Sequence, residues 1–394
     1  MSNGAAWLSG IVTSWAILTT GHAAPYRPSS DEVVLERLPP ALLALRQLRG
    51  SAMPAAGPPN LDAALASAQH YVELGQTYAD PRAYGYAQAA LGEWWTRDDG
   101  ATPALLVMRA RILQFNHRFA PALGQLKVSL ASDQFQPDAW LLLASIEQVQ
   151  GNIPAAQAGC IKLLPMADPL ISATCVATTG ALSGRADAAE QLLARALTQP
   201  SAGGKAVTVW AWTTLAEIRA RRGDATGAQA AFHSALALEP DDVYARAALA
   251  DLLLDEGKNA DARAALGDAS QADALLLRAA IAAQRNGDAD ADDLRRNLEE
   301  RFAEARERGD ETHLREQARF ALDVNHDASH ALGLAVRNFA VQREPADARI
   351  LLEAALASNK PDAASPALEW MRTTGIEAVS LSALSKKLDG GPQG

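Results

Sequence analysis

Three histidines in the C-terminal third are the residues whose types and spacing could bind a metal ion. His326 and His330 lie four residues apart, with Asp327 between them and His313 upstream. Two imidazoles on adjacent turns of one helix can ligate zinc. Asp327, however, is a good N-cap for a helix that starts at Ala328, which would leave His326 outside that helix. We therefore predict no metal site.

The sequence contains none of the short motifs that mark common catalytic sites. Gly-x-Ser-x-Gly, a phosphate-binding loop and His-Glu-x-x-His are all missing, and the seven histidines do not cluster. Adjacent carboxylates such as Asp241 and Asp242 fall at expected helix starts, where capping accounts for them. We predict that the protein is not an enzyme and uses no cofactor.

The only two cysteines, Cys160 and Cys175, lie on either side of a proline-bounded turn at residues 165–169. Cys160 precedes this turn by about five residues and Cys175 follows it by about six, so an antiparallel helix pair would place them at similar heights. Helix axes about 8–10 Å apart can bring such Cα atoms within bridging range. We predict a disulfide. The alternative is two buried thiols in adjacent apolar seams.

Residues 212–240 carry the pattern that must position these side chains. Large apolar residues recur three or four positions apart, as in Trp212 and Leu215, so they share one helix face. Gly223 breaks the chain between two helices, and Pro240 cannot continue the second one. This spacing resembles the tetratricopeptide repeat (TPR), a helix-turn-helix unit of about 34 residues.

Further copies of the pattern occur in phase on both sides. The clearest copies span about residues 103–136, 137–169, 170–202, 209–242, 243–270 and 329–361. One hairpin cannot bury both of its apolar faces, so neighbours are required. We predict an all-α fold, a right-handed TPR-type α-solenoid of antiparallel helix hairpins, over residues 60–389. The register changes at residues 287–293, where we predict an acidic linker and not a TPR turn.

Composition agrees with this fold class and argues against one class of partner. Only 5% of the residues are aromatic, while Ala and Leu are abundant, which suits helix-on-helix packing. The formal net charge is -10, and no basic stripe is present that could neutralise phosphates. We therefore predict that nucleic acid is not a partner.

The first 23 residues look like a cleaved secretory signal peptide. An apolar run is followed by a small-residue exit, with Gly21 and Ala23 at the positions that a signal peptidase prefers. No Lys or Arg precedes the apolar run, so a short anchoring N-terminus is the alternative. We predict a periplasmic or secreted protein with a partly ordered lead-in at residues 24–59 and a disordered tail at residues 390–394.

The chain as a whole is similar to a group of secreted or periplasmic bacterial TPR proteins. The similarity is clearest at residues 84–91, the following Trp94 and Trp95, and residues 341–349. Members of that group are encoded near small membrane proteins of the HupE/UreJ type. The resemblance implies an envelope context and supplies no catalytic motif.

Transferring TPR geometry to the clearest repeats predicts a binding groove. The first helix of each hairpin lines the concave face of a TPR superhelix. The positions that point into it are Trp210, Thr213, Glu217, Arg221, Tyr244, Asp251 and Asp255. Two flat aromatic anchors with a negative rim would suit an extended or helical ligand that has basic and apolar residues. The alternative is a solvated face that keeps the solenoid soluble.

These observations favour a non-catalytic adaptor that binds a protein or peptide partner outside the cytoplasm. An envelope membrane protein is one candidate partner. Two other functions stay open: an accessory role in metal handling, suggested by the three histidines, and a structural scaffold of the envelope.

Overall fold

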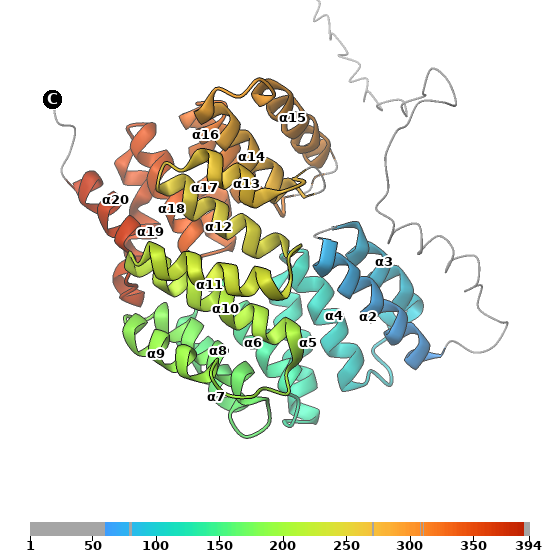
Figure 1. Cartoon of the computed structure of the whole chain (residues 1–394). Helices are drawn as coiled ribbons and strands as arrows, with labels where there is room; N and C mark the ends of the chain where they lie inside the picture. The colour runs from blue at the N-terminus through green and yellow to red at the C-terminus, as the bar shows by residue number, and fades with distance from the viewer. Residues whose placement is uncertain (1–59, 79–80, 270–271, 308, 310, 390–394) are drawn as a thin grey trace, which may run out of the picture. The chain divides into compact units, whose positions relative to one another are not determined.

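The computed structural model describes residues 60–389 other than residues 79, 80, 270, 271, 308 and 310. In this part of the chain the structure consists of helices and turns, with no strand (Figure 1). The helices are α2 (Leu61–Tyr78), α3 (Arg82–Leu91), η1 (Gly92–Trp95), α4 (Pro103–Phe115), α5 (Phe119–Ser132), α6 (Pro137–Val149), α7 (Ile153–Leu163), α8 (Pro169–Ala181), α9 (Ala186–Ala196), α10 (Gly204–Arg222), α11 (Ala225–Leu238), α12 (Val243–Asp255), α13 (Asn259–Leu266), α14 (Asp273–Asn286), α15 (Ala291–Glu307), α16 (Leu314–Asp323), α17 (Ala328–Val341), α18 (Pro345–Ala357), η2 (Pro361–Ala364), α19 (Ser365–Thr374) and α20 (Val379–Asp389).

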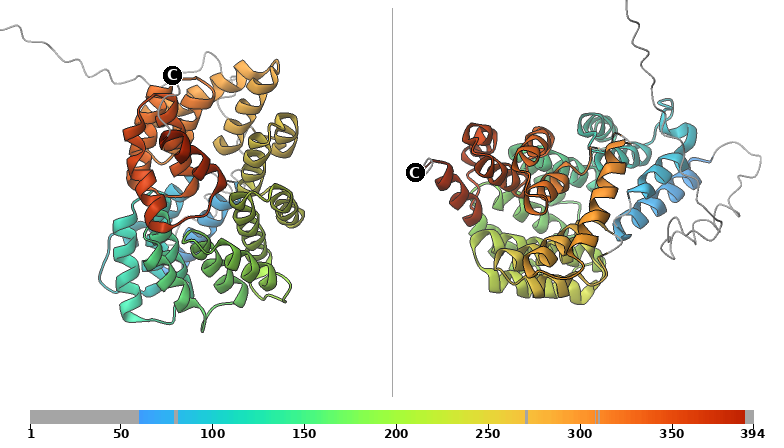
Figure 2. Two further views of the ribbon diagram at one scale, coloured as in Figure 1. Left: turned by 90° about the vertical axis from the view of Figure 1, so that its left-hand side faces the viewer. Right: turned by 90° about the horizontal axis from the view of Figure 1, so that it is seen from above.

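Consecutive helices pack as hairpins, and the first helices of successive hairpins contact one another. The hairpins include α4 with α5, α6 with α7, α8 with α9 and α10 with α11 (Figure 2). As an example of contact between first helices, α10 packs on α8 of the preceding hairpin. All of them belong to one unit, residues 58–394. This arrangement is a TPR-type α-solenoid of antiparallel hairpins, as the sequence predicts.

The seam between hairpins is filled by the residues that define the repeat. Leu215 and Phe232 are each 1% exposed and belong to one continuous core that runs from α8 to α16. Ala216, Ala228 and Ala235 are completely buried, and their small side chains let neighbouring helices approach closely. The apolar spacing therefore fixes which helix faces are covered.

A glycine in the left-handed region ends the first helix of several hairpins. Gly223 closes α10 with a φ of 88°, and the amide of Asp224 donates to the carbonyl of Arg219 at 2.9 Å. Only a residue without Cβ adopts this conformation at low cost. Asp224 then caps α11 through its side chain, which accepts from the amide of Gly227.

The prediction of an acidic linker in place of a TPR turn at residues 287–293 is wrong. Gly287 ends α14 with a φ of 72°, and the amide of Asp288 donates to the carbonyl of Ala283 at 2.9 Å, as at the α10–α11 turn. Helix α15 already starts at Ala291, so Asp292 and Asp293 form its first turn, where acidic side chains suit the helix dipole. The hairpin pattern continues through this acidic segment.

Helix α3 stops at Leu91, because Gly92 has a φ of 52°, and Trp94 and Trp95 lie in the 3₁₀ helix η1. The signal peptide at residues 1–23, the lead-in at residues 24–59 and the tail at residues 390–394 lie outside the described residues. Among those described, no helix is both long and apolar enough to span a bilayer.

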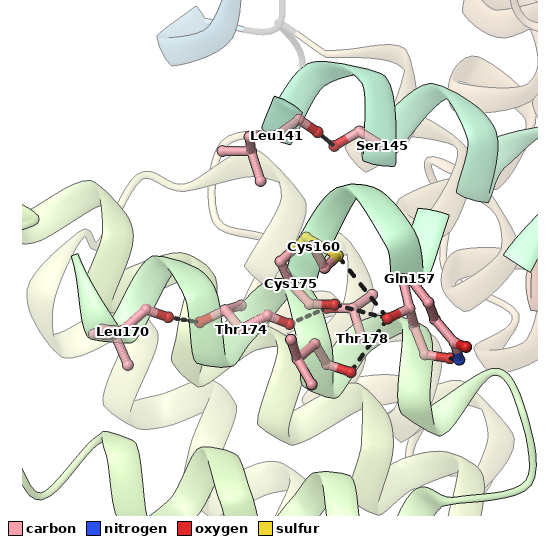
Figure 3. The surroundings of a disulfide bond; sticks show 10 residues. Leu141, Ser145, Gln157, Cys160, Leu170, Thr174, Cys175 and Thr178 are labelled. Atoms are coloured by element: carbon pink, nitrogen blue, oxygen red, sulfur yellow. Dashed lines mark hydrogen bonds between the residues drawn. A yellow bond between two sulfur atoms is a disulfide. The ribbon is translucent and has the colours of Figure 1, made fainter. Parts of the chain in front are cut away.

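The predicted disulfide between Cys160 and Cys175 is present in the structure. It joins α7 to α8 with a Cα–Cα distance of 5.5 Å (Figure 3). Both cysteines are buried in a small cluster with Ala144 and Leu163. The Thr179 hydroxyl lies 4.0 Å from the Cys160 sulfur and also bonds to the carbonyl of Cys175 at 3.1 Å. The bridge therefore fixes the two helices across a repeat boundary.

Opening this bridge should lower stability measurably. Replacing both cysteines with serine removes a crosslink with a sequence separation of 15. The chain-entropy model gives roughly 3 kcal/mol for such a loop, so the unfolding free energy of the double variant should fall by that amount. Urea denaturation of native and variant protein measures the difference. Mass spectrometry after alkylation is the check on the native protein, and two alkylated thiols without reductant would contradict the assignment.

Candidate functional site

Helices α12, α14, α16 and α18 are joined by one network of charged side chains. Asp251 of α12 accepts from Arg278 of α14 at 2.6 Å and from Arg319 of α16 at 2.5 Å. Burial alone would raise the pKa of Asp251, but the two guanidinium groups outweigh it and lower that pKa to about 2. Asp251 is therefore ionised and already paired by its own chain.

Asp255, one turn further along α12, is held in the same way. Arg349 of α18 binds its carboxylate with two nitrogens, at 2.5 and 2.7 Å. Such a bidentate pair is shorter and more directional than an ordinary ion pair. The contact joins residues 94 positions apart in sequence, so it ties the fifth predicted repeat to the last one.

Tyr244, at the start of α12, presents an aromatic ring that solvent reaches. The side chain is 60% exposed, and its hydroxyl donates to the carboxylate of Glu217 on α10. The charge of Glu217 is the main cause that raises the pKa of Tyr244 well above its ordinary value. Arg221 lies 3.8 Å from Glu217 and balances part of that charge. Tyr244 therefore stays neutral, with its ring face open.

Trp210 and Thr213, the remaining predicted groove residues, face protein more than solvent. Trp210 is half-buried and packs against the cluster around the disulfide. Thr213 is 5% exposed, and its hydroxyl donates to the carbonyl of Val209 at 2.8 Å. Helix α10 starts earlier than predicted, at Gly204, and its neighbours cover both side chains. Of the seven predicted residues, Tyr244 offers the most exposed surface.

An acidic pair at the start of α18 extends the network, and the sequence analysis did not single it out. Asp347 is completely buried and accepts from Asn338 at 2.8 Å and from the amide of Glu344 at 2.9 Å. Arg315 of α16 lies 3.3 Å from Glu344 and 3.4 Å from Asp347. The capping-box spacing Glu344-x-x-Asp347 was the available signal.

Glu344 is the group in this network that titrates near neutral pH. Burial, and then the adjacent charge of Asp347, raise its pKa to about 7, although Arg315 opposes the shift. Glu316, by contrast, has its pKa lowered to about 2, because Arg315 and His313 outweigh the effect of burial. Arg315 thus lies near both carboxylates, but its charge outweighs burial only at Glu316.

The three histidines do not converge on a common point. Asp327 caps α17 by accepting from the amide of His330 at 2.9 Å, as the sequence predicts. His326 lies outside that helix with a φ of 54°, and its Nε2 is 3.0 Å from the side-chain amide of Gln284. His313 precedes α16. In the described part of the chain, no group of three or more His, Cys, Asp or Glu side chains is placed to hold a metal ion.

Comparison with known proteins supports the fold. Residues 219–284 match the tetratricopeptide repeat family, whereas a search of curated proteins finds no significant match. The chain is similar to a Rap protein solved in complex with Competence and Sporulation Factor, with 15% identity and a TM-score of 0.52 over 89% of this chain and 92% of that chain. At this identity the likeness shows the fold alone.

Two smaller structures are also similar. PilW, a type IV pilus biogenesis factor, has 20% identity and a TM-score of 0.41, over 51% of this chain and 94% of that chain. A thermophilic TPR protein of Thermus thermophilus has 21% identity and a TM-score of 0.39, over 50% of this chain and 100% of that chain.

The raised pKa of Glu344 predicts a pH-dependent effect of Glu344→Gln. Between the ordinary pKa of 4.5 and the folded-state value of about 7, the folded protein binds more protons than the unfolded chain. The stability from this group is therefore complete below pH 4.5 and is lost as pH rises through 7. At about pH 8 the variant should be more stable than the native protein by roughly 1–3 kcal/mol, and at pH 4.5 the two should be equal.

Urea denaturation at both pH values measures this difference. Glu316→Gln is the matched control, because the lowered pKa of Glu316 predicts the opposite sign, a loss of stability at about pH 8. The same pH profile for native protein and Glu344→Gln would show that Glu344 is an ordinary carboxylate.

Proposed function

We propose that the protein is a non-catalytic scaffold outside the cytoplasm, which binds a protein or peptide segment on the inward face of its solenoid. The observation that carries the proposal is Tyr244, an aromatic side chain that is 60% exposed although half-buried, paired charges surround it. Its hydroxyl bonds to Glu217 of the neighbouring hairpin, but more than half of its surface faces solvent and takes no part in packing. Exposed tyrosines with a polar surround are typical anchors for partner side chains.

Charge around Tyr244 defines the chemistry of the partner. Asp251 and Asp255 are already neutralised by three arginines of the same chain. Near Tyr244, in contrast, the carboxylates of Glu217 and Glu344 face Arg221 and Arg315, and Arg315 also serves Asp347 and Glu316. Negative charge is in local excess there. A basic side chain that stacks on the Tyr244 ring would complement it.

The disulfide supports a location outside the cytoplasm. Disulfides persist in oxidising compartments such as the bacterial periplasm and are rare in the cytosol. The leader at residues 1–23 and the resemblance to secreted bacterial TPR proteins favour the same location. An envelope membrane protein is therefore a reasonable partner to seek.

Replacement of Tyr244 tests the inward face. Native protein immobilised as bait should capture a partner from envelope extract, which mass spectrometry identifies. Tyr244→Ala should weaken that partner's affinity at least tenfold, about 1.4 kcal/mol, without changing helicity or melting temperature. We choose Tyr244 because changes at Trp210 or Asp251 would also disturb the disulfide cluster or two ion pairs.

Phe135→Ala is the matched control for that experiment. Among the described residues, Phe135 is the other strongly exposed aromatic residue, at 80%, and it lies in the loop before α6 and takes no part in the charge network. Its replacement should leave the affinity unchanged. Undiminished binding by Tyr244→Ala would place the site elsewhere, and equal losses in both variants would indicate non-specific apolar adsorption.

Export predicts a defined mature N-terminus. Protein purified from its native host should begin at Ala24 and fractionate with the periplasm or the medium. Edman sequencing or intact mass determines the first residue. Recovery of protein that retains residues before Ala23 would refute cleavage.

A further inference from the structure

A cavity of about 510 Å³ lies where two distant parts of the solenoid meet. It is open on one side and lies between the α6–α7 turn and helices α17, α18 and α19, and Tyr244 is not among its lining residues. The amide of Arg343 donates to the carbonyl of Val149 at 2.7 Å, which joins the α17–α18 turn to the end of α6. The lining residues are Gly151, Val336, Phe339, Ala340, Arg343, Leu351, Pro366, Glu369, Trp370 and Thr373.

One wall of the cavity carries a hydrogen-bond donor without an acceptor. Trp370 is 6% exposed, and its indole Nε1 has no partner among the described residues. Its ring is fixed by edge-to-face packing on Phe339, with centroids 6.2 Å apart. A buried N–H without a partner is unfavourable, so an acceptor delivered to this wall would be bound favourably.

Arg343 lines the same cavity and carries a guanidinium group. A Cβ on Gly151 would lie 3.0 Å from Arg343 Cδ and 3.1 Å from Trp370 Nε1, so the aliphatic stem of Arg343 and the indole both pack against Gly151. Gly151 also has a φ of 79°, which disfavours any other residue. No carboxylate within the described residues pairs with the Arg343 guanidinium.

The remaining walls determine what else the ligand must carry. Glu369 is neutralised by Arg372, which binds it at 2.6 and 2.8 Å, so it does not oppose an anion strongly. Phe339 and Leu351 are buried and form an apolar floor, while Val336 is 43% exposed at the rim. Apolar surface in the same cavity as a cation and an unpaired N–H fits a small anionic group attached to an apolar one.

We propose that this cavity binds the C-terminal residue of a partner polypeptide, with its carboxylate at Arg343 and Trp370 and its apolar side chain on the Phe339–Leu351 floor. At a chain end, the carboxylate and the side chain leave the same Cα atom. An internal acidic residue would instead have to bring a neighbour's apolar side chain to the floor. The proposal rests on the scaffold function and adds a second contact point, distinct from Tyr244.

A partner that ends in Leu or Phe would satisfy both halves of the cavity. Backbone and side-chain groups of this kind capture chain termini in other recognition systems.

The test uses full-length protein and two short probes, acetyl-Ala-Ala-Leu with a free carboxylate and the same peptide as its C-terminal amide. Indole N–H resonances are followed by NMR, and Trp370→Phe identifies the Trp370 signal. The acid should shift that signal in a saturable manner, because the indole gains an acceptor, and the amide should bind at least tenfold more weakly. Acid and amide that act equally, or no shift at millimolar peptide, would overturn the proposal.

Arg343→Gln separates the carboxylate contact from general packing. This variant keeps the backbone bond to Val149 and removes the cation, so affinity for the acid should fall at least tenfold. Arg337→Gln is the matched control, because Arg337 of α17 pairs with Glu311 and does not line this cavity. A loss of binding in Arg337→Gln as large as that in Arg343→Gln would contradict the assignment.

Failure of this proposal can be told apart from failure of the proposed function. The partner captured from envelope extract is tested against both variants. If Tyr244→Ala weakens capture and Arg343→Gln does not, the scaffold function stands and the C-terminal site is wrong. If neither variant affects capture while the acid peptide still shifts Trp370, the cavity binds a chain end and the inward-face function is wrong.

Discussion

A helical hairpin has two apolar faces and only its own partner helix to cover them, and the whole structure follows from that constraint. The core that contains Leu215 and Phe232 runs without interruption from α8 to α16, because each hairpin covers the face that the previous one leaves open. The glycine-ended turns make the hairpins similar enough to stack. The acidic α14–α15 turn shows that the turn geometry, and not the polarity of the segment, preserves the register.

Stacking the hairpins in this way brings the polar edges of the first helices toward one another. Charged side chains at these edges lose part of their hydration, so they need oppositely charged partners. Other residues of the same chain provide these partners, as Arg278 and Arg319 do for Asp251. Because these charges are already paired within the chain, few of them are available to a ligand. A partner must either displace these ion pairs or bind to the groups that they leave accessible. Those groups are the ring of Tyr244 and the carboxylates around Glu344.

Two contacts join repeats that are far apart in the sequence, and each of them changes a candidate binding surface. Arg349 reaches back to Asp255, and the amide of Arg343 reaches the end of α6. The first contact consumes a carboxylate that would otherwise attract a basic ligand. The second forms the cavity with the unpaired indole N–H of Trp370. Contacts between distant repeats therefore occupy one carboxylate and enclose one cavity.

The sequence by itself determined the features that depend on nearby residues. Apolar spacing predicted the helix hairpins, the similar offsets on either side of residues 165–169 predicted the Cys160–Cys175 bridge, and Asp327 was correctly taken as a helix cap, because each of these rests on local geometry. Only the tertiary structure decided which groove positions stay open. The partners of Asp251 and Asp255 on α16 and α18 lie 68 and 94 residues away, and the burial of Thr213 depends on how neighbouring hairpins pack, which no local spacing records.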